Sequence, residues 1–457
     1  MQNKINRVTM ADSYKYSQSS QYPQNTTYMF DYMEARSNKF FNQMVSFGFQ
    51  YMLKKYFSSP IEAWEVEEAA KMCEMHGEPF EYEGWMYIVN ELDGKLPIKI
   101  RTVPEGMVIP VKNIFASIES TDPKVFWIVG WIETFFMKVW YPITVATKSY
   151  FVKQMIQGHL EKSGDPKNIG FKYHNFSDRG CTSVEAASIA GMAHLTQFDG
   201  TDNFNALRDA KIYYNDEMAG FSIKASEHSC VTSWGKDKRF DFYDNYLESS
   251  KALPIVACVM DSYDIYGDVS YITSGKFKEK VESDEYPIFV IRPDSGNPVE
   301  VMNALLNIME DNSVKFHINE KGYKVFDKYA FIWGDGVTPE VIDEVYTYIE
   351  DRGYSADIMS FGSGGDLAQN INRDTLGMAI KCSAVITDGK MVEVYKDPIT
   401  DPGKKSKKGI LELYKIDGNF ITSQRGDYDS KFEVMKDIFI NGEVLIDEDF
   451  KTIKERS

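Results

Sequence analysis

The chain has 457 residues, of which 43% are hydrophobic and 14% aromatic, so it can bury a large core and is not intrinsically disordered. With 51 basic and 68 acidic residues its formal net charge is −17, which disfavours both a nucleic-acid surface and an anionic membrane as partners. At one domain per ~150 residues, the length predicts two or three domains.

The cysteines and the apolar segments indicate where the protein works. Five cysteines, an odd number without a Cys-x-x-Cys pair, form neither a disulfide framework nor a zinc ribbon and favour a reducing, cytoplasmic compartment. The first twenty residues contain no apolar run, so no secretory signal is expected. Residues 125–140 are strongly apolar but are interrupted by Glu133 and Lys138, which favours a buried helix over the ~20-residue span that a membrane requires.

The two ends of the chain show the alternation that is typical of antiparallel strands. In the first ~150 residues, segments 77–92 and 96–111 alternate apolar and polar side chains around turn residues. From about residue 385 onward, three segments predict hairpins with the turns Asp388-Gly389, Asp417-Gly418 and Asn441-Gly442.

Between these ends four segments share another plan. In each, a short apolar run stops at Asp, Gly or Ser and a helical pattern follows; the segments are 253–268, 286–298, 329–340 and 355–367. One helix is well marked, with Thr338 as N-cap, Pro339 at the first position and Gly353 as its stop. Alternating strands and helices predict a parallel α/β arrangement, and in barrels of this kind chemistry occurs where strands end.

The strand ends carry candidate ligand-binding residues. Arg292 and Asp294 lie two apart, so both side chains can face one way; Arg292 suits a phosphate or carboxylate, and Asp294 suits ribose hydroxyls or a Mg²⁺ shell. Residues 361–366 (FGSGGD) resemble a phosphate cradle but lack the Walker and GxGxxG spacings, so an ATP-binding P-loop or Rossmann site is not supported. Asp335, between two glycines, suits a ribose. An ordinary turn explains the motif at 292–298 equally well, is the simpler interpretation of 361–366, and is the more common origin of a motif such as 334–336.

Other candidates are ambiguous when taken singly. His228 lies beside Glu227, but none of the six histidines forms a ligand pair, so no metal site is expected. Phe176 and Arg179 can bracket a flat ring, although a core Phe and a surface Arg would show the same pattern. The basic segment 396–409 is either a solvated loop or a lysine-rich loop that closes over phosphate.

Taken in order, these motifs closely resemble the nicotinamide phosphoribosyltransferase family from about residue 10 to 410. The resemblance is carried by DSYK (12–15), QYP (21–23), the RG after Phe176, GTD (200–202), EHS (227–229), DSYDIY (261–266), RPDSGNP (292–298), GDG (334–336), FGSGG (361–365) and KDPxxDPxKxSKKG (396–409). It implies an α/β fold: an irregular (β/α) barrel of the type II phosphoribosyltransferase kind over residues 151–384, and a second α+β domain from residues 1–150 and 385–457. It also implies a cytoplasmic homodimer with shared active sites that makes nicotinamide mononucleotide and pyrophosphate from nicotinamide and phosphoribosyl pyrophosphate in NAD biosynthesis.

The resemblance assigns roles to residues of this chain. For nicotinamide it implies Phe176 and the partner subunit's Tyr14 around the ring, with Asp202, Arg179 and Ser222 in the same pocket. For the phosphoribosyl and pyrophosphate groups it implies Arg36, Arg292, Gly334, Asp335, Gly364, Gly365, Arg373, Lys381, Lys396 and Lys404. It implies His228, Asp264 and Asp294 as catalytic residues, Mg²⁺ carried by the pyrophosphate groups, and ATP as an energy source that phosphorylates His228. No protein-held metal, nucleic acid or membrane is implied.

Three residues depart from the family pattern: Asp178 before Arg179, Met260 before Asp261, and Asp366, which adds a charge to the glycine run. Two other functions remain open at this point. One is nicotinate phosphoribosyltransferase, which shares the fold and the donor. The other is a non-catalytic protein that binds sugar phosphates.

Overall fold

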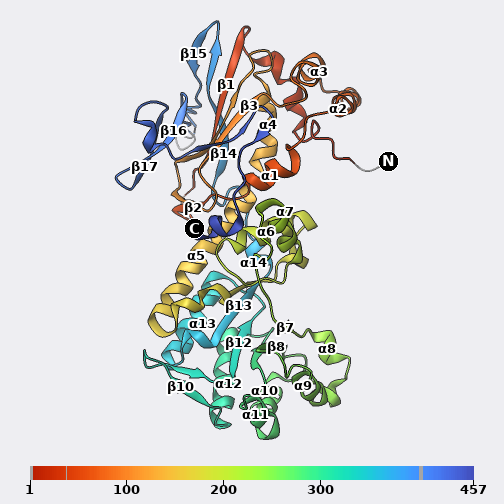
Figure 1. The fold of residues 1–457 in the computed structure, drawn as a ribbon. Coiled ribbons are helices and arrows are strands. Elements are labelled where there is room, and N and C mark those ends of the chain that lie inside the picture. The colour runs from red at the N-terminus through yellow and green to blue at the C-terminus, as the bar shows by residue number, and fades with distance from the viewer. Residues whose placement is uncertain (1–3, 38, 401–404) are drawn as a thin grey trace. The chain divides into compact units, whose positions relative to one another are not determined.

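Segments from both ends of the chain fold together in the computed structural model, which describes residues 4–37, 39–400 and 405–457 (Figure 1). The chain forms two compact units. Unit 1 comprises Met1–Thr147, Ala210–Asp216 and Asn372–Ser457, and unit 2 comprises Lys148–Asp209 and Glu217–Ile371.

Unit 1 is organised around a seven-stranded antiparallel sheet with the order β15-β14-β1-β5-β3-β18-β19. Strands from the two chain ends alternate in it, and β1 pairs with β14 through partners such as Met33 and Ile380. The strands of this unit are β1 (Thr26–Ala35), β2 (Gln43–Val45), β3 (Ile98–Thr102), β4 (Val108–Pro110), β5 (Ile114–Ser120), β14 (Met378–Thr387), β15 (Lys390–Glu393), β16 (Leu411–Ile416), β17 (Asn419–Gln424), β18 (Lys436–Ile440) and β19 (Glu443–Val444).

All three hairpins predicted near the C-terminus are confirmed. They join β14 to β15, β16 to β17 and β18 to β19. Both residues of each turn have positive φ, as in Asp417 (48°) and Gly418 (82°). This is the conformation of a type I′ turn, whose twist matches that of the paired strands.

Helices account for one correct and one wrong prediction in unit 1. The apolar segment 125–140 contains the buried helix α4, as predicted, and Trp131 on α4 packs edge-on against Trp85 at 4.7 Å. Segment 77–92, predicted as a strand, instead contains α3, because its buried residues Trp85 and Ile88 are three apart and so share a helix face. The helices are η1 (Ser13–Gln21), α1 (Phe49–Tyr56), α2 (Ala63–His76), α3 (Tyr82–Glu91), α4 (Ile128–Met137), η7 (Ser430–Phe432) and α15 (Phe450–Arg456).

No helix of the described residues is both long enough and apolar enough to cross a membrane. Two helices, α5 (Trp140–Ser163) and α7 (Phe204–Tyr214), contribute residues to both units.

Unit 2 is built on a six-stranded parallel sheet with the order β6-β13-β12-β9-β8-β7. Two isolated parallel bridges, Asn175 to Thr201 and Gly200 to Phe221, continue the sheet from β6 toward the segment that leads into β7. The sheet therefore curls into an irregular barrel, as predicted. Its strands are β6 (Tyr173–Asn175), β7 (Lys224–Ala225), β8 (Ile255–Val259), β9 (Ile288–Arg292), β12 (Tyr329–Trp333) and β13 (Met359–Ser363), and a separate hairpin pairs β10 (Phe316–Ile318) with β11 (Lys324–Phe326).

Helix α13 (Pro339–Asp351) begins and ends as the sequence predicts. The Thr338 hydroxyl accepts from the N–H of Val341 at the start of α13, Pro339 is the first helical residue, and Gly353 follows the helix with φ of 79°. The other helices of unit 2 are η2 (Pro166–Phe171), η3 (Asp178–Gly180), α6 (Val184–Leu195), α8 (His228–Thr232), η4 (Lys236–Lys238), α9 (Arg239–Glu248), α10 (Ile265–Ile272), α11 (Gly275–Val281), α12 (Pro298–Asp311), α13 (Pro339–Asp351), η5 (Ala356–Ile358) and α14 (Gly365–Ala368).

Candidate active site

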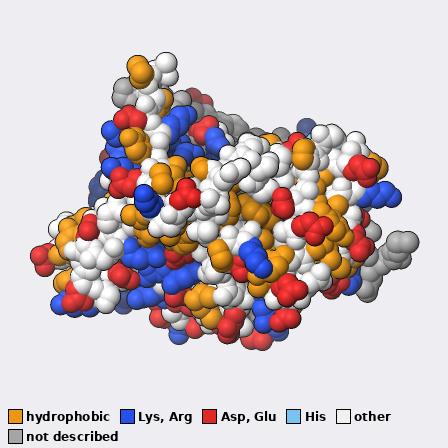
Figure 2. All heavy atoms as spheres, turned by 90° about the horizontal axis from the view of Figure 1, so that it is seen from above, with side chains coloured by type: hydrophobic (Ala, Val, Ile, Leu, Met, Phe, Trp, Pro, Cys, Tyr) orange, Lys and Arg blue, Asp and Glu red, His pale blue; other side chains and the backbone are white. Residues whose placement is uncertain are grey.

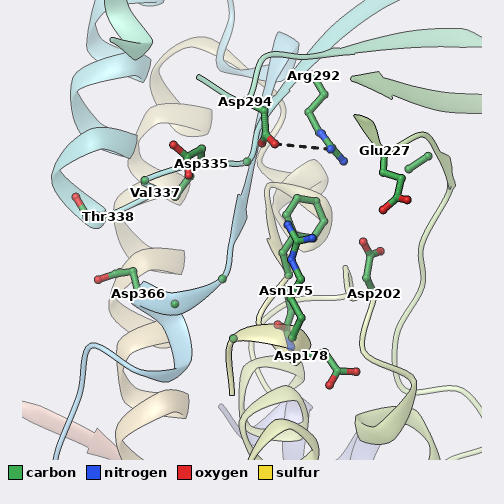
Figure 3. A pocket seen from close by; sticks show the side chains of 18 of the residues that line it. Asn175, Asp178, Asp202, Glu227, Arg292, Asp294, Asp335, Val337, Thr338 and Asp366 are labelled. Carbon is green, nitrogen blue, oxygen red and sulfur yellow. Dashed lines mark ion pairs between the residues drawn. The ribbon is translucent and has the colours of Figure 1, made fainter. Parts of the chain in front are cut away.

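The ends of the parallel strands of unit 2 surround a pocket of about 880 Å³ (Figure 3). Its walls come from the segments that follow β6, β9, β12 and β13 and from residues near β7. Nine residues singled out from the sequence line it: Phe176, Arg179, Asp202, Arg292, Asp294, Gly334, Asp335, Gly364 and Gly365. The carboxyl ends of parallel strands thus converge on one cavity, as the barrel rule requires.

The pocket wall is strongly acidic. Six carboxylates line it against two guanidinium groups, a formal net charge of −4; the acids are Asp178, Asp202, Glu227, Asp294, Asp335 and Asp366, and the bases are Arg179 and Arg292. A ligand rich in phosphate needs additional positive charge to bind here, whereas an anionic ring meets repulsion.

Phe176 lines the pocket, and a glycine makes room for its ring. A Cβ on Gly362 would lie 1.9 Å from the Phe176 ring, and one on Gly334 would lie 3.5 Å from it. The backbone N–H of Phe176 donates to the carbonyl of Ser363 at 2.9 Å, which ties the residue to the end of β13. The ring is therefore fixed in position, with part of its surface open to the pocket.

Asp202 is held as an acceptor by two donors. His174 Nε2 lies 2.9 Å from Asp202 Oδ1, and the Ser222 hydroxyl donates to the same oxygen at 2.6 Å. Burial works to raise the pKa of Asp202, but the hydrogen bond and charge of His174 and the hydrogen bond of Ser222 outweigh it, so the pKa lies below its usual value. Asp202 is therefore ionised near neutral pH.

His174 was not among the candidates from the sequence. Its ring occupies the space left by Gly200, whose Cβ would lie 2.4 Å from His174 Nδ1, and it contacts the Phe176 ring at 5.1 Å between centroids. A signal for it does exist in the sequence: residues 174 and 176 are two apart at the end of a strand and so share a face.

Arg292, Asp294 and His228 form a second group. Asp294 Oδ2 lies 3.8 Å from Arg292 Nη2 and 3.4 Å from His228 Nε2. His228 Nδ1 contacts the Ser262 hydroxyl at 2.9 Å, so both nitrogens of the half-exposed ring have polar neighbours. The carboxylate orients the imidazole, although His228 itself is not among the residues that line the pocket.

Asp261, rather than Asp264, is the other carboxylate beside this group. Asp261 Oδ1 lies 3.8 Å from His228 Nε2, and its Oδ2 accepts from the N–H of Asp294 at 3.2 Å. Asp264, which the family resemblance assigns to catalysis, is exposed and caps α10 by accepting from the N–H of Gly267 at 3.1 Å. Asp261 comes two residues after β8, so the strand-end rule distinguishes the two carboxylates.

The opposite side of the pocket contains two glycine-rich turns, one after β12 and one after β13. Gly364 and Gly365 follow β13, and a Cβ at Gly365 would meet nothing within 4 Å, so the turn leaves open space. After β12, the indole of Trp333 donates to the carbonyl of Asp335 at 2.6 Å and fixes the second turn. Small residues with accessible N–H groups suit an anion such as phosphate.

The remaining predicted residues lie in unit 1. Tyr14 is 55% exposed on η1, and Arg373 is exposed beside Asp374. Burial lowers the pKa of Lys381, and the positive charges of Arg36 and Lys396 act in the same direction, so these three cations lie within electrostatic reach of one another. Lys404 lies outside the described residues.

Figure 2 shows basic side chains gathered in places on one face despite the acidic net charge.

No group of three or more His, Cys, Asp or Glu side chains in the described parts of the chain is arranged to hold a metal ion.

Comparison with solved structures defines the class of fold. The structure resembles nicotinate-nucleotide pyrophosphorylase from Pyrococcus furiosus, with a TM-score of 0.62 at 15% identity over 100% of this chain and 95% of that one. It also resembles human nicotinic acid phosphoribosyltransferase, with a TM-score of 0.60 at 12% identity over 97% and 92% of the two chains. The fold is thus that of a type II phosphoribosyltransferase.

Sequence comparison defines the family. Residues 171–442 match the nicotinate phosphoribosyltransferase (NAPRTase) family, and residues 6–100 match the nicotinamide phosphoribosyltransferase N-terminal domain. Nicotinamide phosphoribosyltransferase of Xanthomonas campestris pv. campestris is 43% identical over 90% of this chain and 88% of its own, and that of Acinetobacter baylyi is 26% identical over 99% and 97%. The chain belongs to the nicotinate/nicotinamide phosphoribosyltransferase family.

Proposed function

We propose that the protein is a nicotinamide phosphoribosyltransferase that joins nicotinamide to phosphoribosyl pyrophosphate and releases pyrophosphate, in NAD biosynthesis. The observation that carries the proposal is the ionised Asp202 on the pocket wall. His174 and Ser222 both contact Oδ1, and among the described residues Oδ2 has no hydrogen bond, so it can accept from a ligand.

An ionised acceptor selects an amide. The carboxamide N–H₂ of nicotinamide can donate to Asp202, whereas the carboxylate of nicotinate would meet a like charge and leave both groups unsatisfied. The five other carboxylates of the wall act in the same direction. This arrangement favours nicotinamide over nicotinate, the nearest alternative.

The flat ring also has a surface to stack on. Phe176 is fixed against Gly362 and lines the pocket, and Arg179 lines the same cavity. Stacking on an aromatic ring stabilises a planar heterocycle by about 0.5–1.5 kcal/mol beyond the area it buries. We infer that Tyr14 of a second subunit covers the other face of the ring, in a homodimer with shared sites.

The donor fits the other side of the pocket. The turns at Gly334–Asp335 and Gly364–Gly365 offer backbone N–H groups to the 5′-phosphate, and Asp294 can accept from ribose hydroxyls. Arg36, Arg373, Lys381, Lys396 and Lys404 are proposed to meet the phosphates. Because the wall is acidic, we infer that pyrophosphate enters with Mg²⁺, which would neutralise its charge and improve it as a leaving group.

The chain's own residues mainly position the reactants. Phe176 and Asp202 hold the ring nitrogen toward the anomeric carbon; this nitrogen forms the new C–N bond as the C–O bond to pyrophosphate breaks. The transition state resembles an oxocarbenium ion, and the carboxylates of Asp294 and Asp335 stabilise its positive charge.

ATP is proposed as a coupled energy source. A nitrogen of the half-exposed His228 ring would attack the γ-phosphorus of ATP, forming a P–N bond as the bond to ADP breaks. Asp294 and Asp261 would hold the imidazole and stabilise its positive charge. Cys73, Cys230, Cys258 and Cys382 are free thiols, which supports a reducing, cytoplasmic setting.

The base preference of Asp202 variants tests the proposal. In Asp202→Ser the preference for nicotinamide over nicotinate, measured as the ratio of kcat/KM values, should fall by at least about tenfold, because the repelling charge is gone. Asp178→Ser is the matched control: it also removes a carboxylate from the wall, but one that is paired with the Asn205 amide at 3.1 Å.

Two results would contradict the proposal. Equal use of nicotinamide and nicotinate by the wild type would indicate a nicotinate phosphoribosyltransferase or an enzyme that does not discriminate between the two bases. Absence of phosphoribosyl-pyrophosphate-dependent pyrophosphate release with either base would favour a non-catalytic sugar-phosphate-binding protein.

A further inference from the structure

A buried lysine lies directly behind the glycine turn that follows β13. Lys148 belongs to α5, and its side chain is only 8% exposed. Its Nζ donates to the backbone carbonyl of Asp366 at 2.7 Å and lies 2.6 Å from Asp366 Oδ2. A lysine is rarely buried unless it is paired, so the contact with Asp366 accounts for its position.

Asp366 is an unexpected residue for this place in the pocket. It comes immediately after Gly364 and Gly365, lines the same cavity, and has a 12% exposed side chain whose Oδ1 accepts from the Asn370 amide at 2.9 Å. A carboxylate at the mouth of a phosphate-binding turn would repel the anion that the turn is built to hold.

We propose that Lys148 is a positioning residue for the phosphate side of the pocket, which neutralises Asp366 and fixes the turn so that its backbone can accept a phosphate. This inference rests on the proposed function for the identity of the ligand. It assigns Lys148 a role in the affinity for the sugar-phosphate donor and none in the choice of base.

The surroundings of Lys148 support a role in both turns. The pKa of Glu340 lies below its usual value. The largest cause is a hydrogen bond from the backbone N–H of Glu340 itself, the next is a hydrogen bond from the Thr338 hydroxyl, and the positive charge of Lys148 contributes to the same shift. Glu340 is the second residue of α13, which follows the turn after β12. Lys148 therefore pairs directly with Asp366 and acts at longer range on Glu340, and each of these acids follows one of the two turns on this side of the pocket.

The variant Lys148→Met tests the proposal, because it keeps most of the side-chain volume and removes the charge. An uncompensated carboxylate several ångströms from a phosphate should raise KM for phosphoribosyl pyrophosphate about tenfold or more. KM for nicotinamide should stay within about twofold, since the base contacts are made elsewhere.

A second substitution distinguishes charge compensation from a purely structural role. In Lys148→Met/Asp366→Asn both charges are removed, so KM for the donor should return to within about threefold of the wild type. Lys162→Met is the matched control: Lys162 lies on the same helix and contacts the buried Glu350 at 2.8 Å, but neither residue lines the pocket. It should lower thermal stability without changing either KM.

Titration calorimetry with ribose 5-phosphate keeps this inference separate from the proposed function. A wild type that binds ribose 5-phosphate but makes no mononucleotide would overturn the proposed function alone. Lys148→Met with unchanged affinity for ribose 5-phosphate, or a double variant no better than the single one, would overturn the role of Lys148. A parallel rise in both KM values would also overturn it, because it would indicate a general loss of structure.

Discussion

The two sides of the pocket in unit 2 are built by different means. One side is made of side chains that hold one another: His174 contacts Asp202 and Phe176, and glycines make room for the rings. The other is made of two glycine-containing turns, and Asp366, which follows one of them, is paired with Lys148. The side made of side chains can recognise the chemical groups of a ligand, whereas the side made of turns recognises its charge and shape. Substitutions on the two sides should therefore fail in different ways.

The largest effect is expected at a glycine that serves the side-chain wall. In Gly362→Ala the new Cβ would lie 1.9 Å from the Phe176 ring, so the ring must leave its position. A displacement of this size at a group that positions a reactant should lower kcat/KM about 100-fold. Steady-state kinetics measures the loss, and a near-normal circular dichroism spectrum would show that the barrel still folds. Retained activity would show that the position of Phe176 is unimportant.

A smaller effect is expected when the donor to Asp202 is removed. His174→Phe should reduce the preference for nicotinamide over nicotinate about tenfold, and His174→Gln, which keeps an N–H donor, should restore part of it. The effect should depend on pH. In the wild type the lowered pKa of Asp202 keeps it ionised, so the preference is flat from pH 8 to about 6.

In His174→Phe, burial of Asp202 is no longer offset by the hydrogen bond and charge of His174, and its pKa rises. The preference should then decline as the pH falls, because a protonated Asp202 no longer repels nicotinate. Competition between the two bases at a series of pH values measures this. If the preference for nicotinamide over nicotinate is independent of pH in both the wild type and His174→Phe, His174 does not contribute to the choice of base.

The smallest effect is expected at a glycine of the backbone wall. In Gly365→Ala the new Cβ meets no protein atom within 4 Å, so folding and base preference should be unchanged. KM for phosphoribosyl pyrophosphate should rise only a few-fold, because the methyl group intrudes on the ligand alone. Thermal unfolding and the KM values of both substrates provide the measurement. A decrease in kcat/KM as large as that expected for Gly362→Ala would contradict the proposed difference between the two sides of the pocket.

The sequence was most informative where local signals determine the structure. Apolar runs that end at Asp, Gly or Ser located four barrel strands, and Asp-Gly and Asn-Gly pairs located three hairpins. The sequence wrongly predicts a strand in segment 77–92, because the segment fits both an alternating and a helical pattern. Only the packing of Trp85 and Ile88 shows that the helical pattern applies.

The candidate site was less predictable where partners are distant in sequence. Phe176, Asp202, Arg292 and Gly365 line one pocket, as the family resemblance implies. No local pattern indicates that Lys148 compensates a residue 218 positions later. The choice between Asp261 and Asp264 depends on where β8 ends, and strand boundaries are the least certain part of a sequence-based prediction.

The barrel of unit 2 also has a weak seam. Between β6 and β7 the ring of strands continues only through isolated bridges, with the N–H of Thr201 donating to the carbonyl of Phe221 at 2.9 Å. Asp202 and Ser222 each adjoin one of these residues, on opposite sides of the seam. The N–H of Phe221 donates in turn to the carbonyl of Asp199 at 2.7 Å. Loosening of this pairing would break the hydrogen bond of 2.6 Å between Ser222 and Asp202, so amide exchange at Thr201 and Phe221 should slow when a heterocycle binds to Asp202.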